Sequence, residues 1–438
     1  RAILRITVLM PDRMLCYNWK GMVIKMKQIK PNKNTNIYIL PSQKFKTFCV
    51  DLKFFVKMDK ETAALNAVFP FVMRSGSEKY PTSVEVGKCL ENCYGGIFDA
   101  GVRKKGDIQE IEFFFEFVAP DYSDENQIEN CTAFINEMLL NPLVENGAFS
   151  EKYTEIEKNN LIDYIEGIIN DKKEYTAVRL IEEMFKGEPY GLYESGTKED
   201  VEKITAQKLF EQYKKVIYSA PLSIFISGNA DGEKIAEGLK SLTAYERENI
   251  PTSKLYEKHN EKPVCVTEKA DTVQGKFGLG FKTGVKADSE DYFKLTLLNG
   301  VFGSGPTSKL FMNVREKMSL CYYVYSRLNR LKGIMTVFIG CDRENFRKAY
   351  DEIFNQLNMC RNGDITDEEI VNAKNFLITV LKQTNDSQRS LTEYYTTGML
   401  AGLCVSIDEY IDKIKNCTKE DIVRLASAIE LEAEFYLG

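Results

Sequence analysis

The chain has 438 residues, of which 44% are apolar and 28% are charged, and its formal net charge is −6. This length and apolar content can form substantial cores and predict two to four domains. The well-mixed charges argue against nucleic acid as a main partner, because phosphate binding requires a concentrated basic face. No run reaches the roughly 18 apolar residues of a membrane span. Eleven scattered cysteines, an odd number, are typical of a reduced, cytoplasmic protein.

The first 21 residues differ from the rest of the chain. The chain begins with Arg1 instead of Met, and residues 1–21 contain its only tryptophan and no clear hydrophobic period. The short apolar stretch near the start lacks the length and the small-residue cleavage site of a secretion signal. We therefore expect an extension outside the fold at 1–21, and we expect the first domain to begin at Met22.

The first part of the chain predicts alternating groups of strands and helices. Residues 111–118 alternate a face of Ile and Phe with a face that carries Glu112 and Glu116, the pattern of a half-buried strand. The basic run at 103–105 is interpreted as a solvent-exposed hairpin. In chain order, the expected elements are a strand at 45–55, helices at 63–73 and 83–93, two strands around the turn 104–107, a long helix from Phe149, a helix ending at Gly187, a helix at 205–216 and a strand at 222–227.

The second part repeats this order, which indicates two diverged copies of one unit. Both long helices end in Asn-Asp, at 170–171 and 385–386, and Thr366 with Glu369 forms a capping box at the start of the second one. The elements expected here are a strand at 276–285, helices at 292–301 and 307–317, strands at 322–328 and 334–339, a long helix from Ile365, a helix ending at Gly402, a helix at 418–428 and a strand at 434–437.

This repeat predicts an N-terminal domain at 22–241 and a C-terminal domain at 263–438. The segment 242–262 between them is polar and is interpreted as a linker, in which the only histidine, His259, is a solvated surface residue. Strands followed by helix pairs, mostly joined by hairpins, indicate the α+β class. We expect two homologous halves, each a mostly antiparallel sheet with helices packed on one face.

Residues 298–326 combine a Gly-rich turn, a short amphipathic helix that carries Arg315, and a β-prone run that begins at Tyr322. Taken alone, an Arg near a helix end and a Tyr in a strand are more often structural. The turn at 303–306 does not fit a phosphate cradle, because it lacks the Lys-Ser/Thr of a P-loop and Pro306 removes an amide donor. A tight turn that lets another chain approach is the better interpretation.

This segment resembles the C-terminal half of the pitrilysin or insulinase family of zinc peptidases, which includes the mitochondrial processing peptidase. The matching features are the Gly-rich turn, the runs Lys309-Leu310-Phe311 and Arg315-Glu316-Lys317, and the spacing from Arg to Tyr. In that family the Arg and the Tyr bind the substrate backbone and polarise the scissile carbonyl. The resemblance assigns this role to Arg315 and Tyr322, and a developing oxyanion is stabilised by such fixed cationic and O–H donors.

The zinc site of this family is a His-x-x-Glu-His helix motif with a further Glu as third ligand. Because the chain has one histidine, it holds no such motif. In the segment that resembles the site, Ala67 and Phe71 replace the two His and Pro70 replaces the general base. Tyr164 stands at the third ligand position, while Glu157 upstream is retained. The resemblance therefore implies a family member without a catalytic metal or other cofactor of its own.

The resemblance extends over nearly the whole chain from Met22 and implies two halves arranged as a clamshell around a chamber. In some two-subunit members, one chain carries zinc and the other lends the Arg–Tyr pair. We therefore expect a non-catalytic subunit that binds a peptide and supplies Arg315 and Tyr322 to a zinc-bearing homologous partner in a heterodimer. A homodimer, a non-enzymatic scaffold or peptide-binding protein, and a structural subunit like the respiratory-complex core proteins are the alternatives.

Overall fold

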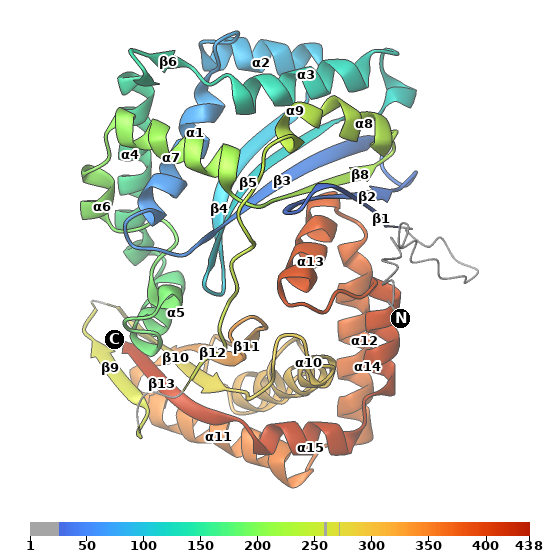
Figure 1. The fold of residues 1–438 in the computed structure, drawn as a ribbon. Coiled ribbons are helices and arrows are strands. Elements are labelled where there is room, and N and C mark those ends of the chain that lie inside the picture. The colour runs from blue at the N-terminus through green and yellow to red at the C-terminus, as the bar shows by residue number, and fades with distance from the viewer. Residues whose placement is uncertain (1–25, 258–260, 271) are drawn as a thin grey trace, which may run out of the picture.

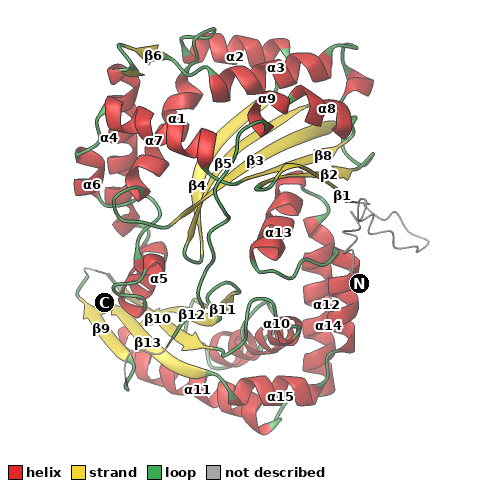
Figure 2. Cartoon of the chain, viewed as in Figure 1, coloured by secondary structure: helices red, strands yellow, loops and turns green. Residues whose placement is uncertain are grey.

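Two sheets, each next to its own set of helices, form the two halves of the molecule (Figures 1 and 2). This computed structural model describes residues 26–257, 261–270 and 272–438. The expected extension at 1–21 and the histidine His259 lie outside these residues. No helix in the described ranges has the length and apolar character to cross a membrane.

The first half contains a six-stranded sheet in the order β1-β2-β8-β3-β5-β4. Among these strands, β2 and β8 run parallel and the other neighbours are antiparallel. The strands are β1 (Lys27–Asn32), β2 (Thr35–Pro41), β3 (Thr47–Lys57), β4 (Ile97–Lys105), β5 (Ile108–Val118) and β8 (Leu222–Gly228); β6 (Val144–Glu145) and β7 (Ala148–Phe149) form a separate pair.

Helices cover one face of this sheet because the strands alternate. Phe54 on β3 and Phe113 on β5 point to the same side, together with Phe48 and Phe117, and all are buried against helices. The helices of this half are α1 (Ala63–Ser75), α2 (Ser83–Asn92), α3 (Gln127–Leu140), α4 (Glu151–Gly167), α5 (Lys172–Met184), α6 (Lys198–Glu202), α7 (Ala206–Ser219), α8 (Gly232–Gly238) and α9 (Lys240–Thr243).

The second half contains a five-stranded sheet in the order β11-β12-β10-β13-β9, in which β13 and β9 are parallel. Its strands are β9 (Val264–Glu268), β10 (Gln274–Lys282), β11 (Tyr323–Asn329), β12 (Ile334–Asp342) and β13 (Glu430–Leu437). Its helices are α10 (Asp291–Phe302), α11 (Phe346–Asn362), α12 (Asp367–Thr384), α13 (Gln388–Leu400), α14 (Ile407–Asn416) and α15 (Lys419–Ser427). The predicted capping box at Thr366 is present at the start of α12.

The predicted fold class is confirmed: the chain is α+β, with two sheet–helix halves arranged as a clamshell. The strands of the two sheets lie within 27–228 and 264–437, whereas the exact domain limits stay a prediction. One element differs in kind. The segment expected as an α-helix at 307–317 contains a π-helix, η4 (Leu310–Lys317), which ends where the Met318 N–H bonds the Asn313 carbonyl. π-helical turns are frequent at functional sites.

The two halves exchange helices. The helix α5 belongs to the first half by sequence, but Leu180 and Met184 pack on the second sheet against Phe338 and Phe435. The helix α13 belongs to the second half, and it packs on the face of the first sheet that is turned toward the second half (Figure 1). Each sheet is therefore covered on both faces, by helices of its own half and by one helix of the other half.

Two glycines on β10 allow the close approach of α5. A Cβ atom at Gly278 would lie 3.0 Å from the Leu180 Cδ2 atom, and one at Gly280 would lie 2.6 Å from the Met184 Sδ atom. Without side chains at these positions, the helix can lie directly on the strand. At the first sheet, Leu391 and Tyr395 of α13 instead pack among side chains of β2 and β8, including Tyr38 and Phe225.

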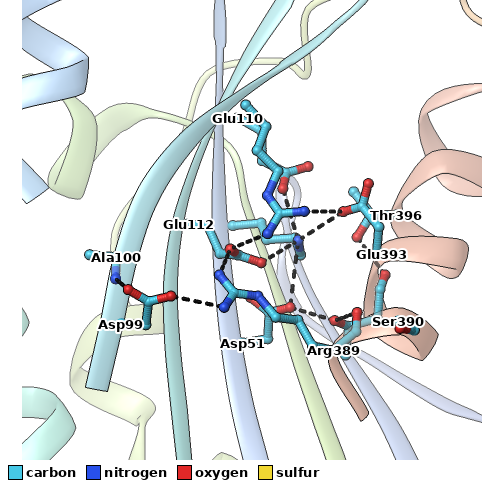
Figure 3. Close-up of polar contacts among 12 residues, drawn as sticks. Asp51, Asp99, Ala100, Glu110, Glu112, Arg389, Ser390, Glu393 and Thr396 are labelled. Carbon is cyan, nitrogen blue, oxygen red and sulfur yellow. Dashed lines mark hydrogen bonds and ion pairs between the residues drawn. The ribbon is translucent and has the colours of Figure 1, made fainter. Parts of the chain in front are cut away.

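This exchange corrects the interpretation of 111–118 as a half-buried strand. The face that carries Glu112 is not solvated, because α13 covers it: Glu110 and Glu112 are 0% and 1% exposed. The charged residues between the first sheet and α13 form what we call the inter-half charge cluster (Figure 3). It comprises Asp51, Lys53, Asp99, Arg103, Lys105, Glu110, Glu112, Arg389 and Glu393.

Lys53 is the centre of the inter-half charge cluster. Its Nζ atom lies 2.8 Å from Glu110 Oε1, 3.0 Å from Glu112 Oε1 and 3.5 Å from Asp51 Oδ2. Burial by itself would lower the pKa of the ammonium, but the three carboxylates raise that pKa above its ordinary value. For Glu112, burial raises the pKa, whereas Lys53, Arg103 and Arg389 lower it, with a net result of about 2.

The basic run at 103–105 is also part of this contact, so its interpretation as a solvent-exposed hairpin is wrong. Arg103 donates to Glu112 Oε2 at 3.1 Å, and Lys105 pairs with Glu393 of α13. Lys104 donates to two backbone carbonyl groups in the loop after α5, at 2.9 and 2.6 Å. The sequence could not indicate this, because the acceptors lie up to about 290 residues away along the chain.

Asp51 is expected to make stability pH-dependent near neutrality. Burial raises the pKa of its carboxyl group to about 7, against the opposing effect of Lys53, so the folded chain retains a proton that the unfolded chain releases near pH 4. The contribution of Asp51 to the free energy of unfolding is complete below about pH 4 and is lost as the pH rises to about 7, at up to about 1.4 kcal/mol per pH unit.

Urea denaturation between pH 5.5 and 7 measures this loss, and Asp51→Asn should remove it. The Glu112 carboxyl group stays ionised throughout that range, because its pKa is about 2. If the free energy of unfolding changes with pH in the same way for the wild type and Asp51→Asn, Asp51 is already ionised in the folded chain.

Candidate functional site

Three of the four positions where the sequence analysis expects a lost metal site meet at one cavity. Ala67 and Phe71 on α1 and Tyr164 on α4 line a cavity of about 420 Å³. Pro70 is buried within α1 and is not among the lining residues. The full lining is Ala67, Phe71, Arg74, Gly101, Val102, Glu157, Asn160, Leu161, Tyr164, Tyr193, Glu194 and Ser195.

The packing of α1 on α4 positions these side chains. The helix α1 packs on α4, on α7 and on the first sheet, and Ala67 is fully buried among these contacts. Glu157 on α4 is held by two hydrogen bonds: its carboxylate accepts from the Ser75 hydroxyl at 3.3 Å and from the Asn160 amide at 3.0 Å. Glu157 is therefore fixed in the cavity wall, about two turns of α4 from the exposed Tyr164.

The donors in this cavity do not fit a zinc ion. A catalytic zinc takes about three N, S or O ligands from the protein, but the positions that the sequence analysis predicts to replace the two His present a methyl group at Ala67 and a phenyl ring at Phe71. Two carboxylates, Glu157 and Glu194, are the acidic donors in the lining. Across the described residues, no group of three or more His, Cys, Asp or Glu side chains is arranged to hold a metal ion.

Arg315 and Tyr322 lie in the other half and do not line this cavity. Arg315 is on η4, where its guanidinium lies 4.6 Å from the centre of the Phe311 ring and 3.7 Å from Glu316 Oε1. Tyr322 directly precedes β11, and its hydroxyl donates weakly to the Asp342 carboxylate at 3.3 Å. Both side chains are exposed, by 40% and 54%, so neither is needed to fill a core.

Several lining residues were missed by the sequence analysis. Tyr193, Glu194 and Ser195 come from the loop that follows the short 3₁₀ turn Pro189–Gly191, and they line the cavity together with residues of α1 and α4. The Tyr193 hydroxyl donates to the Tyr164 hydroxyl at 3.4 Å, and burial raises the pKa of Tyr193 above its ordinary value. No motif marks this loop, so only its position beside α4 identifies it.

Comparison with known proteins relates most of the chain to the peptidase family that the sequence analysis names. A family sequence model described as "Peptidase M16 inactive domain" matches residues 203–377. The Bacillus subtilis protein YmfF, named "Probable inactive metalloprotease", is 30% identical over 403 residues, which are 91% of this chain and 95% of YmfF. Among solved structures, a conserved protein from Enterococcus faecalis is 28% identical with a TM-score of 0.87 and covers 94% of this chain and 98% of its own.

A peptidase M16 inactive domain from Pseudomonas fluorescens is more distant. It is 15% identical, has a TM-score of 0.76, and covers 94% of this chain and 97% of its own. At this level of identity, the likeness shows the fold alone.

Proposed function

Since this chain belongs to the M16 family of peptidases, the pitrilysin and insulinase family, as an inactive member, we propose that it is the non-catalytic subunit of a two-chain zinc peptidase. In this proposal it binds the substrate peptide in the cytoplasm and supplies Arg315 and Tyr322 to a zinc-bearing homologous partner. The observation that carries the proposal is the contrast between two sites. The proposed oxyanion donors Arg315 and Tyr322 are exposed, whereas the positions predicted to replace the metal ligands hold a methyl group and aromatic rings.

The surroundings of the Arg–Tyr pair support a role toward another chain. Met312 and Met318, on and directly after η4, are 47% and 45% exposed and flank Arg315 in the sequence. Exposed apolar side chains next to a fixed cation are suited to being covered by a partner surface. Within the part of the chain that the structure describes, the Arg315 guanidinium pairs only loosely with one carboxylate, Glu316 at 3.7 Å, so its charge remains available to a carbonyl oxygen.

An open sheet edge supports peptide binding. β4 is the edge strand of the first sheet, and a Cβ atom at Gly101 would meet nothing within 4 Å. An edge strand presents unpaired backbone groups to which an extended peptide can add as a further strand. Gly101 and Val102 also line the cavity, so a peptide on β4 would pass directly beside it.

The alternative function is a scaffold in which the Arg–Tyr pair is inherited without use. In the proposed pair, the exposed Arg315 and Tyr322 contact the substrate in the partner's active site, whereas in a scaffold they contact no substrate. Co-purification decides whether a partner exists: the tagged chain should capture a homologue that carries an intact His-x-x-Glu-His motif.

We expect Arg315→Ala or Tyr322→Phe, introduced into the reconstituted pair, to lower kcat/KM by at least roughly ten-fold. Each change removes one donor to the developing oxyanion, a loss that costs about 10²–10³ in rate in other enzymes. Hydrolysis of a fluorogenic peptide measures the effect, and the zinc content and assembly of the pair should not change. Arg327→Ala is the matched control, because Arg327 is an exposed Arg on the neighbouring strand β11.

The double variant tests the alternative function. If the pair carrying Arg315→Ala and Tyr322→Phe together cleaves as fast as the wild type, the chain is a scaffold.

A further inference from the structure

Three cysteine side chains that the proposed function does not use lie together where α2 ends. Cys89 is in the last turn of α2, and Cys93 is the C-cap residue one helical turn later. Cys131 lies on α3 and is completely buried, whereas Cys93 is almost completely buried and Cys89 is partly buried. All three are free thiols, and we call them the thiol cluster.

The packing of α3 against the end of α2 brings Cys131 to Cys93 (Figure 1). The Gln127 side-chain amide, in the first turn of α3, donates to the Cys93 carbonyl group at 3.4 Å. Cys131 follows Gln127 by one helical turn, so it lies on the same face of α3. Cys93 and Cys131 also belong to the same hydrophobic core, that of the first half. The contact between the two helices therefore holds these two thiols within reach of each other.

Within the thiol cluster, Cys93 accepts hydrogen bonds from both of its neighbours. The S–H group of Cys131 donates to the Cys93 sulfur, and that of Cys89 does so as well. The hydrogen bond from Cys131 is the main cause that lowers the pKa of the Cys93 thiol to about 7, against the opposing effect of burial. The same bond raises the pKa of Cys131 far above its ordinary value. Cys93 is therefore the thiolate of the cluster, and the thiolate is the form that attacks an oxidant.

A small oxidant can reach Cys93 because α2 is weakly attached to the rest of the molecule. Among the residues of α2, all of which the structure describes, Val86 is the one that is fully buried. A segment with few buried apolar contacts opens locally at a low cost in free energy. Such an opening exposes Cys93 at the helix end, while Cys131 stays in the core on α3. When α2 closes again, Cys93 returns to Cys131.

We propose that the thiol cluster is a peroxide-sensitive modification site, in which Cys93 is oxidised and then forms a disulfide with Cys131. The Cys93 sulfur attacks one oxygen of hydrogen peroxide, the S–O bond forms, the O–O bond breaks, and the leaving hydroxide takes up a proton to become water. The Cys131 sulfur then attacks the sulfenic acid on Cys93, the S–S bond forms, and the S–O bond breaks. The second hydroxide leaves with the Cys131 proton as water.

The reaction is balanced, because two thiols lose two electrons and the peroxide is reduced to two water molecules. This inference is independent of the proposed function, since the thiol cluster shares no residue with the cavity lining or with the Arg–Tyr pair.

The test treats the purified, reduced chain with a small molar excess of hydrogen peroxide and blocks the remaining thiols before digestion. Mass spectrometry should then find two peptides joined by a Cys93–Cys131 disulfide, which dithiothreitol reverses. The Cys93 thiol should be lost at least roughly ten-fold faster than that of Cys360, a completely buried cysteine on α11. Cys360→Ala is the matched control, and it should form the same disulfide as the wild type.

Two variants separate the two steps. Cys131→Ala removes the resolving thiol, so oxidation should be slower and should stop at a sulfenic acid on Cys93, which dimedone traps. Cys93→Ala should leave Cys131 reduced, and thermal unfolding checks the fold of each variant. The wild-type result by itself confirms or contradicts the inference, even where a variant does not fold. If Cys93 and Cys131 of the wild type stay reduced, or if the disulfide joins Cys93 to Cys89 instead, the inference is wrong.

Discussion

The Lys53→Met chain is expected to have a free energy of unfolding about 3–5 kcal/mol lower than that of the wild type. Lys53 is completely buried, and its ammonium bonds Glu110 and Glu112 at 2.8 and 3.0 Å. Methionine keeps the approximate volume but removes the cation, so the buried Glu110 loses the ammonium that bonds it, while Glu112 keeps Arg103 and Arg389. Glu110 must then take up a proton or remain charged in a buried site, and both outcomes cost free energy.

Urea denaturation at constant pH measures this loss. Lys57→Met is the matched control, since Lys57 lies at the exposed end of the same strand, and it should change stability by less than about 0.5 kcal/mol. Combining Lys53→Met with Glu110→Gln should recover part of the loss, because one uncompensated charge is removed as well. A Lys53→Met chain with an unchanged denaturation midpoint would mean that water reaches these carboxylates.

Phe185→Ala is expected to lower the free energy of unfolding by a similar amount, about 3–5 kcal/mol. The Phe185 ring is fully buried at the end of α5, in edge-to-face contact with Tyr190 at 4.7 Å and Tyr256 at 5.1 Å. It belongs to the cluster in which α5 packs on the second sheet. Its loss leaves a cavity in the contact between the halves, so the two halves should also separate more readily.

Limited proteolysis under native conditions distinguishes this effect from a general loss of stability. Phe134→Ala is the control, because Phe134 is equally buried but lies within the core of the first half. Both variants should unfold at a lower urea concentration, and only Phe185→Ala should yield fragments cut between the two halves. If the two variants give the same fragments, α5 does not hold the halves together.

Part of the candidate site was indicated by the family resemblance. The three positions Ala67, Phe71 and Tyr164, which the resemblance predicts to replace metal ligands, line one cavity; helix geometry fixes the spacing of Ala67 and Phe71 within α1. Pro70 is buried within α1 and lies outside the lining. Tyr193 and Glu194 could not be predicted, because a loop residue enters a site through the path of the chain and not through a local period.

The sequence by itself determined the repeat, the strands with their apolar faces, the capped helices and the family. These features depend on residues within a few positions of one another, where hydrophobic period and turn chemistry act. Only the tertiary structure decided which helix covers which sheet. From the sequence alone, the polar face of β5 is expected to be solvated. In the structure, Arg389 and Glu393 of α13, which are about 280 residues away along the chain, pair with the charged residues of this region. Burial of charge depends on such distant partners, because a carboxylate enters a dry interface only where a cation meets it.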